Sequence, residues 1–357
     1  MVDSFGTFRT ARREPAVALQ PLVDPAGWEP DEIARSRDWA YRLSGTDCDE
    51  LAGAIDAVAR RGIEIVDMKA ADFPLPRLSP VIADMRRELL DGRGFVYIRG
   101  IPVGDMTWEQ SAIAYFGIGL HLGRPLSQNA AGHLLGHVKD YGGHLMDPHT
   151  RGYQTSAELG FHSDHSAFVG LLCLRTAKEG GASRIASSVT LYNRLLATHP
   201  DLVQVLSQDF YWSRHGEVPP GKEPWYTQPA FAFKNGYFSA RGVGNDIRKT
   251  QGMPGVPPFT PLQIEAMALF QKTTRECAVD LDFEQGDIQF LHNNVVLHAR
   301  TAYVDWPEPE RRRHLMRLWL SDDDTGRPLT ESFRENFQGI RVEGYKPQVP
   351  FDVPVGA

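Results

Sequence analysis

Residues 161–165 read Phe161-His162-Ser163-Asp164-His165, at the start of an apolar stretch that continues to residue 174. This stretch predicts a β-strand, on which alternate side chains point to the same face of a sheet. His162 and Asp164 would therefore point the same way, whereas Ser163 and His165 would point to the other face. An imidazole and a carboxylate that converge in this way can supply two ligands to a metal ion.

A third ligand is expected from the second strand-like stretch, residues 288–300. His298 follows an apolar run there and is the preferred candidate, and His292 is the alternative. Two histidines and one carboxylate on one face of an iron ion leave three coordination positions open, as in non-haem iron oxygenases. Because the chain has 12 histidines and 45 acidic residues, a His-x-Asp pair alone is weak evidence, and the context has to support it.

That context is a third predicted strand, residues 314–320, with the arginine-rich residues 311–313 before it. Alternation puts Arg313, Leu315, Arg317 and Trp319 on one face. A guanidinium inside a barrel is costly unless it is paired, and its planar fork matches a carboxylate. An incoming dicarboxylate would supply the partner.

The rest of the chain supports a mainly β protein with helices, of the α+β class. Helices are predicted at 49–61, 79–90, 107–120, near Ser188, after Pro200 and from Thr260, with short strands at 63–66 and 95–98. Strands separated by irregular inserts favour an antiparallel barrel with helices packed outside. We expect an irregular N-terminal segment, 1–45, and a single domain, 46–357, with an insert at about 185–280. The irregular stretch 123–155 is expected to border a cavity.

Composition narrows the class of function. The formal charge is −7 with interspersed signs, which argues against nucleic acid as a partner. Three cysteines more than 100 residues apart fit neither a disulfide framework nor a zinc site, and no run is long and apolar enough to span a membrane. We therefore expect a soluble, cytoplasmic protein with a small-molecule substrate; the sequence leaves its oligomeric state open.

With these residues in place, the chain resembles the taurine dioxygenase-like, or clavaminate synthase-like, Fe(II)/2-oxoglutarate-dependent oxygenases over roughly residues 95–320. The shared pattern is His-x-Asp, a long insert, a distal histidine and then an arginine strand. The resemblance implies a double-stranded β-helix, or jelly-roll, barrel with a helical insert and flanking helices. It also implies Fe(II) bound by His162, Asp164 and His298, with 2-oxoglutarate and O₂ as cosubstrates.

The resemblance also suggests a cosubstrate site. Gly180-Gly181-Ala182-Ser183 is similar to the family's Gly-Gly-x-Thr segment, so Ser183 would contact 2-oxoglutarate. Arg313 would pair with its distal carboxylate, and Arg317 would lie near the cosubstrate or the substrate. Two further departures are a 15-residue interval from His298 to Arg313 and His292-Asn293-Asn294 where the family often has Trp-Asp-Asn.

The implied reaction hydroxylates, desaturates or cyclises an unactivated C–H bond of a small organic molecule, with release of succinate and CO₂. Asp164 excludes halogenation, because related halogenases have a small residue there. Arg317 favours a substrate that bears an acid group. Arg300 and Asn129 are further substrate candidates; the alternatives are an arginine at the cavity rim and an asparagine that caps a loop.

Several other features have structural explanations. His165 is expected to face away from the metal, and it is interpreted as a packing residue or as a residue that supports a metal ligand. His133, His137, His144 and His149 fit no metal-ligand spacing. The aromatic residues of 211–226 form either a lid or a patch that fixes a loop to the barrel.

Two rival functions remain at this point. A zinc hydrolase could use the same His/Asp/His ligands, but it would leave the inward arginines unexplained. A non-catalytic barrel that binds a small anion would explain the arginines, but it would leave the His-x-Asp pair without a role.

Overall fold

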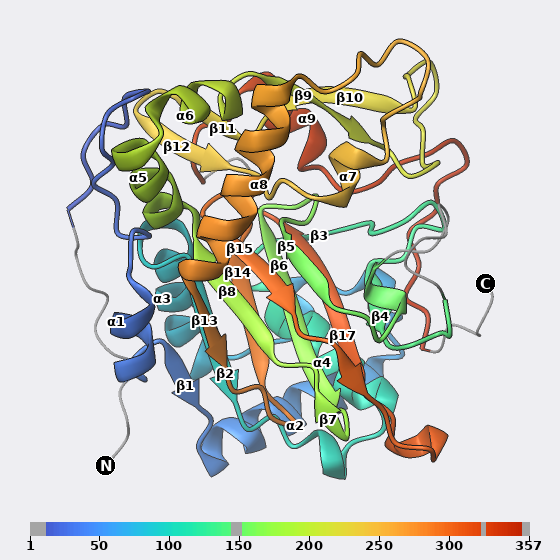
Figure 1. Ribbon diagram of the computed structural model, residues 1–357. Coiled ribbons are helices and arrows are strands. Elements are labelled where there is room, and N and C mark those ends of the chain that lie inside the picture. Colours follow the sequence, from blue (N-terminus) through green and yellow to red (C-terminus); the bar gives the residue numbers. More distant parts are fainter. Residues whose placement is uncertain (1–11, 144–151, 323–325, 352–357) are drawn as a thin grey trace.

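Two β-sheets form the centre of the protein in this computed structural model, which describes residues 12–143, 152–322 and 326–351 (Figure 1). The larger sheet has the spatial order β1 (Ala40–Arg42), β2 (Phe95–Arg99), β14 (Ile288–His292), β6 (Phe168–Arg175), β17 (His314–Ser321) and β3 (Arg124–Leu126), and β4 (Leu135–Val138) also pairs with β17. The smaller sheet has the order β13 (Ala278–Leu281), β8 (Ser183–Ser187), β15 (Val296–Arg300) and β5 (Leu159–His162). Apart from the parallel pair β1–β2, the ladders are antiparallel, and the fold is the predicted α+β jelly roll.

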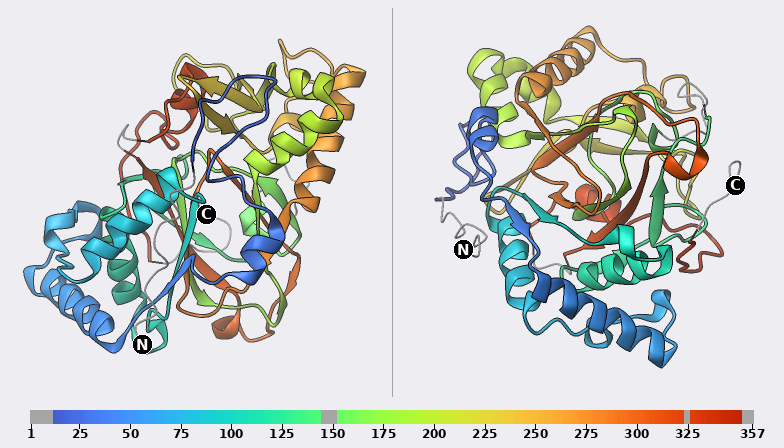
Figure 2. Two further views of the ribbon diagram at one scale, coloured as in Figure 1. Left: turned by 90° about the vertical axis from the view of Figure 1, so that its left-hand side faces the viewer. Right: turned by 90° about the horizontal axis from the view of Figure 1, so that it is seen from below.

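Helices cover the sheets in two groups. Figure 2 (left) shows the light-blue, cyan and teal helices of residues 45–120 on one side and the yellow-green and orange helices of the insert on the other. The first group packs on the larger sheet and comprises α2 (Gly45–Arg61), α3 (Leu78–Asp91) and α4 (Trp108–Leu120). The second packs beside the smaller sheet and comprises α5 (Ser188–Thr198), α6 (Pro200–Leu206) and α8 (Pro261–Glu276). Of the described helices, none is long and apolar enough to cross a membrane.

Capping residues set where the main helices begin. Thr107 with Gln110 and Thr260 with Gln263 form the predicted capping boxes of α4 and α8. Helix α2 begins at Gly45, four residues earlier than expected, because Ser44 and Asp47 form another capping box. These caps satisfy backbone N–H groups that would otherwise lack partners.

The insert between β8 and β13 adds short hairpins and helices. The hairpins are β9 (Asp209–Ser213) with β10 (Trp225–Pro229) and β11 (Phe231–Lys234) with β12 (Tyr237–Ala240). Outside the insert, β7 (Glu179–Gly180) pairs with β16 (Tyr303–Val304). The short helices of the chain are α1 (Pro30–Arg35), α7 (Asn245–Arg248) and α9 (Glu331–Asn336).

Three local expectations were wrong. The stretch 161–174 is two strands, β5 and β6, separated by a turn that contains Asp164. Residues 63–66 do not form a strand, since the chain makes a 3₁₀ turn at Ile65–Asp67. The stretch 123–155 is not wholly irregular, because β3 and β4 both pair with β17.

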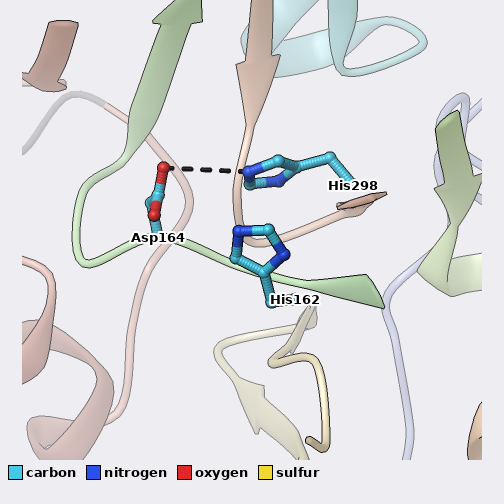
Figure 3. Close-up of side chains that lie close together, drawn as sticks. All are labelled: His162, Asp164 and His298. Carbon is cyan, nitrogen blue, oxygen red and sulfur yellow. Dashed lines mark ion pairs between the residues drawn. The ribbon is translucent and has the colours of Figure 1, made fainter. Parts of the chain in front are cut away.

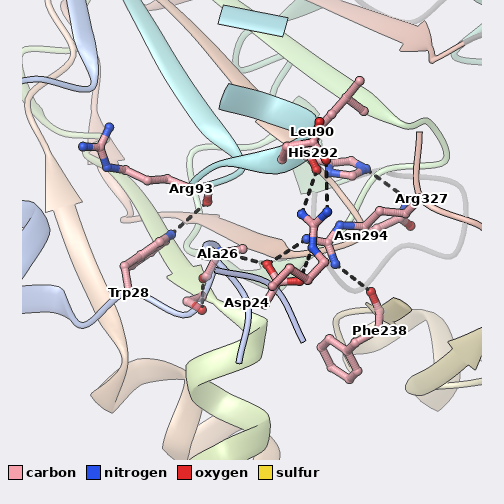
Figure 4. Close-up of polar contacts among 12 residues, drawn as sticks. Asp24, Ala26, Trp28, Leu90, Arg93, Phe238, His292, Asn294 and Arg327 are labelled. Atoms are coloured by element: carbon pink, nitrogen blue, oxygen red, sulfur yellow. Dashed lines mark hydrogen bonds and ion pairs between the residues drawn. The ribbon is translucent and has the colours of Figure 1, made fainter. Parts of the chain in front are cut away.

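The N-terminal segment is also less irregular than expected. It contains α1, and its strand β1 extends the larger sheet beside β2. Asp24 accepts a hydrogen bond from Arg327 at 2.8 Å, and the Trp28 indole donates to the Arg93 carbonyl at 2.9 Å (Figure 4). These contacts fix the segment against the barrel.

Candidate active site

Three side chains converge at one end of the smaller sheet. His162 ends β5, and His298 lies directly opposite it on β15, with the ring centroids 4.2 Å apart. Asp164 lies in the turn after β5, where its backbone N–H donates to Asn293 Oδ1 at 3.0 Å. One ligand atom from each of the three residues lies within 4.8 Å of the others, and Figure 3 shows the side chains pointing toward one another.

The protonation states of these groups suit a cation. Burial would raise the pKa of Asp164, but the charges of Arg317, His298 and His162 outweigh it and lower the pKa to about 2. Burial lowers the pKa of His298 to about 3, with His162 acting in the same direction and Asp164 opposing it. At neutral pH the cluster therefore presents a carboxylate beside a neutral imidazole.

Hydrogen bonding leaves ligand atoms free. His162 Nδ1 bonds to the Gly160 carbonyl at 2.9 Å, so it acts as the donor and leaves Nε2 with its lone pair. Asp164 Oδ2 is buried without a hydrogen-bond partner in the described structure, and it lies 3.7 Å from His298 Nε2. A buried carboxylate oxygen that has no donor among the described residues and lies near two imidazoles fits a divalent metal ion.

His292, the alternative third ligand, lies elsewhere. It is fully buried at the end of β14, where Asn294 Nδ2 lies 3.3 Å from its Nε2 and the Phe168 ring packs against it. The grouped ligand atoms among the described residues are those of His162, Asp164 and His298.

An inner cavity extends from this cluster between the two sheets. Its volume, counted as the space that the centre of a water molecule can occupy, is about 50 Å³. Its polar wall includes Ser183, Arg300, Arg313 and Arg317, and its apolar wall includes Val138, Leu159, Leu171, Phe283 and Leu315. The stretch 123–155 contributes Val138 and Tyr153, in agreement with the expectation that it borders a cavity.

Arg313 brings a buried cation to this cavity. It lies just before β17 and is only 5% exposed, and its Nη1 is buried without a hydrogen-bond partner among the described residues. Its guanidinium lies 5.1 Å from the centre of the Tyr303 ring. Ser183 also faces the cavity, and its hydroxyl donates to Gln289 Oε1 at 2.9 Å. Arg313 therefore offers a cation to an anion in this cavity, and the Ser183 side chain lines the same wall.

Arg317 lines the inner cavity but has protein partners. Its Nε donates to Gln128 Oε1 at 2.7 Å, and its Nη1 lies 3.4 Å from Asp164 Oδ1. Alternation along β17 is confirmed, since Arg313, Leu315 and Arg317 all line this cavity. Gln128 was not singled out in the sequence, although its neighbour Asn129 was.

A second, larger cavity, here called the outer cavity, also borders the cluster. Its volume on the same measure is about 480 Å³, and His162, Asp164 and Arg317 line both cavities. Apolar side chains of its wall include Phe161, Val243, Met267 and Trp319, and its cations include Arg248, Lys249 and Arg275. The carboxylate of Asp246 is paired with His215 at 2.9 Å. These cations could not be predicted from the sequence, because they lie in or next to α7 and in α8, two separate helices of the insert.

The two remaining substrate candidates lie in different places. Asn129 accepts from the His133 backbone N–H at 3.2 Å and contacts its ring, so it caps a loop. It is absent from the described walls of both cavities. Arg300 lines the inner cavity.

The other histidines have structural contacts. His137 bonds to His314 at 2.8 Å, whereas His144 and His149 lie outside the described residues. His165 packs near Trp319 and bonds to the Asn336 carbonyl.

The aromatic residues of 211–226 hold the β9–β10 hairpin in place. Trp212 is fully buried, and its indole donates to the Gln228 carbonyl at 2.8 Å. His215 in the same hairpin lines the outer cavity, so the hairpin both packs on the barrel and borders the cavity.

A jelly roll with a His/Asp/His cluster between two cavities defines the class of non-haem iron oxygenases. Residues 60–319 match the family model described as "Taurine catabolism dioxygenase TauD, TfdA family", and the chain belongs to this family. The protein is a 2-oxoglutarate-dependent non-haem iron dioxygenase that uses Fe(II) and O₂. The zinc-hydrolase and non-catalytic alternatives are therefore set aside.

Two curated relatives cover most of the chain. FR-33289 synthase of Streptomyces rubellomurinus (strain ATCC 31215) is 30% identical over 333 residues, which cover 91% of this chain and 97% of that protein. The taurine hydroxylase-like protein SAT17 of Stachybotrys chartarum (strain CBS 109288 / IBT 7711) is 28% identical over 316 residues, which cover 85% and 80%.

Solved structures share the fold. An asparagine oxygenase in complex with Fe(II), 2S,3S-3-hydroxyasparagine and succinate superposes with a TM-score of 0.62 at 17% identity, covering 85% of this chain and 99% of that one. The non-haem iron oxygenase OrfP in complex with Fe and alpha-ketoglutaric acid gives 0.60 at 17% identity, covering 80% and 94%.

Proposed function

We propose that His162, Asp164 and His298 hold Fe(II), and that the protein hydroxylates, desaturates or cyclises a small molecule that bears an acid group. The reaction would release succinate and CO₂. One observation carries this proposal: the three grouped side chains line the inner cavity, and His162 and Asp164 also line the larger outer cavity. The inner cavity also holds the buried guanidinium of Arg313, whose Nη1 has no hydrogen-bond partner among the described residues.

The inner cavity is proposed to bind 2-oxoglutarate. Arg313 would pair with the distal carboxylate, and the Ser183 hydroxyl would lie beside it. The buried, unpaired Nη1 of Arg313 supports this role, because a guanidinium deep in a barrel is stabilised only when an anion reaches it. When bound, the iron supplies the redox chemistry that couples decarboxylation of 2-oxoglutarate by O₂ to oxidation of the substrate.

The outer cavity is proposed to bind the substrate. Its apolar wall can hold a carbon skeleton, and Arg248, Lys249 and Arg275 can attract an acid group. Since His162 and Asp164 also line this cavity, a substrate held there would present a C–H bond to the metal. The chain's task is then to position that bond and exclude water from it.

The proposed experiment has two stages. Under anaerobic conditions, the protein with Fe(II) and 2-oxoglutarate is expected to give a weak metal-to-ligand absorption band in the visible, which His298→Ala abolishes and His292→Gln retains. The absence of a band from wild-type protein would refute the iron and 2-oxoglutarate assignment.

In the second stage, O₂ is admitted with a panel of small acids and amino acids, and substrate-dependent succinate is measured. Replacing Arg248 and Arg275 with glutamine is expected to raise KM for the best acid substrate by about tenfold, because two charges are lost from the cavity. An unchanged KM would show that these cations do not bind the substrate's acid group.

A further inference from the structure

We infer that Arg300 binds the distal carboxylate of 2-oxoglutarate together with Arg313, so that two guanidiniums select the cosubstrate. This inference rests on the proposed function, and it assigns Arg300 to the cosubstrate rather than to the substrate.

Strand pairing sets the position of Arg300. In the β15–β8 ladder, Arg300 lies directly opposite Ser183, and His298 lies two residues earlier on β15. Residues directly opposite each other on antiparallel strands project to the same face, as do residues two apart on one strand. Arg300 therefore points into the inner cavity beside the Ser183 hydroxyl, and all three residues line it.

The guanidinium of Arg300 is buried without an ion-pair partner among the described residues. Arg300 is 6% exposed, its Nη2 donates to the Ala157 carbonyl, and its Nε and Nη1 are buried without hydrogen-bond partners in the described structure. Native proteins rarely leave such donors unsatisfied, and a charged group makes the cost larger. Two nitrogens of Arg300, Nε and Nη1, are thus available to a ligand.

Arg313 offers its own unpaired Nη1 to the same cavity. The Tyr303 ring connects the two arginines, since its centre lies 4.7 Å from the Arg300 guanidinium and 5.1 Å from that of Arg313. Asp305 Oδ1 accepts a hydrogen bond from the backbone N–H of Arg313 at 2.7 Å.

One carboxylate can accept hydrogen bonds from the unpartnered nitrogens of both arginines. It has two oxygens and about four lone-pair directions, so it can accept hydrogen bonds from two guanidiniums. The substrate's acid group is a poorer match, because Arg300 belongs to the inner cavity and is absent from the described wall of the outer one. The pair Arg300–Arg313 therefore favours a 2-oxo acid with a distal carboxylate.

The test compares Arg300→Met with a matched control, Arg184→Met. Arg184 lies next to Ser183 on β8, but its guanidinium pairs with Asp280 away from the cavity. Titration of the anaerobic visible band gives Kd for 2-oxoglutarate and for 2-oxopentanoate, which keeps the chelating keto acid but ends in a methyl group. Iron affinity is measured separately by competition with a chelator.

Arg300→Met is expected to raise Kd for 2-oxoglutarate by about 10- to 100-fold, the loss typical of hydrogen bonds to a charged group. Kd for 2-oxopentanoate should change less than about twofold, so that selectivity falls, while iron affinity should stay unchanged. Arg184→Met should behave as the wild type. Arg300→Lys, which keeps the charge, should give an intermediate Kd for 2-oxoglutarate. If Arg300→Met does not fold, Arg300→Lys is compared with the wild type in its place.

A Kd for 2-oxoglutarate within about twofold of the wild-type value in Arg300→Met and Arg300→Lys would overturn the inference. A raised substrate KM with that unchanged Kd would assign Arg300 to the substrate instead. If the wild-type protein itself does not bind 2-oxoglutarate, the proposed function is refuted. This outcome differs from an unchanged Kd in the Arg300 variants, which refutes only the role of Arg300.

Discussion

Arg317 holds Asp164 in place while it lines both cavities. Its Nη1 lies 3.4 Å from Asp164 Oδ1, and its Nε is anchored by Gln128 Oε1 at 2.7 Å. Asp164 lies in a turn rather than on a strand, so its carboxylate depends on such contacts for its orientation. We therefore interpret Arg317 as a positioning residue for the proposed metal ligand.

Loss of this contact is expected to weaken metal binding. Arg317→Gln should lower Fe(II) affinity by about 10- to 100-fold, the usual effect of removing a group that orients a ligand. Competition with a chromophoric chelator measures the affinity, and Arg311→Gln, an exposed change before the same strand, serves as control. Equal affinities for Arg317→Gln and wild type would contradict the positioning role.

Gly242 is expected to be essential for the position of His162. A Cβ at residue 242 would lie 2.6 Å from His162 Cα and 2.9 Å from its carbonyl carbon, so the backbone would have to move. Gly242→Ala should cost about 1–3 kcal/mol of stability, typical of overpacking, and should also weaken iron binding.

Gly160→Ala is the matched control for this change. Gly160 is two residues before His162, and a Cβ there would meet nothing within 4 Å. Denaturant unfolding and iron titration of both variants check the prediction. It fails if Gly242→Ala is as stable as Gly160→Ala and binds iron equally well.

Buried His292 is expected to make the protein less stable in acid. Burial, together with the charge of Arg327, lowers the pKa of His292 to about 3 (Figure 4). Between about pH 6.5 and that value the unfolded state binds one more proton than the folded state, so this contribution to stability falls as pH falls. The contribution is fully present above about pH 6.5.

His292→Gln removes this titration. From pH 7.5 to 5.5, the free energy of unfolding of the variant should fall by roughly 1 kcal/mol less than that of the wild type. The other titratable groups are the same in both proteins, so their contributions cancel in the comparison. Urea denaturation at the two pH values measures the difference. Identical pH dependence for the two proteins would mean that His292 is not held neutral.

The residues of the site could be predicted from sequence where local spacing decides their position. The alternation of Arg313, Leu315 and Arg317 needs only a strand, and β17 is a strand whose side chains line the inner cavity as expected. His298 and Arg300 share a face for the same reason.

Contacts between distant segments could not be predicted in this way. The β5 strand ends at His162, and Asp164 reaches the cluster because Asn293, from the turn after β14, captures its backbone N–H. Arg317 finds its partners 153 and 189 residues away in the chain. No local pattern encodes either contact.

The central claim is that the His162, Asp164 and His298 centre couples 2-oxoglutarate and O₂ to substrate oxidation. It is tested most directly by supplying ¹⁸O₂ to iron-loaded protein with 2-oxoglutarate and the best substrate of the panel, and by analysing the succinate by mass spectrometry. We predict succinate carrying one ¹⁸O atom from the wild type and from His199→Ala, an exposed control, but none from His162→Ala. Unlabelled succinate from the wild type, or equal labelled succinate from His162→Ala, would contradict the account.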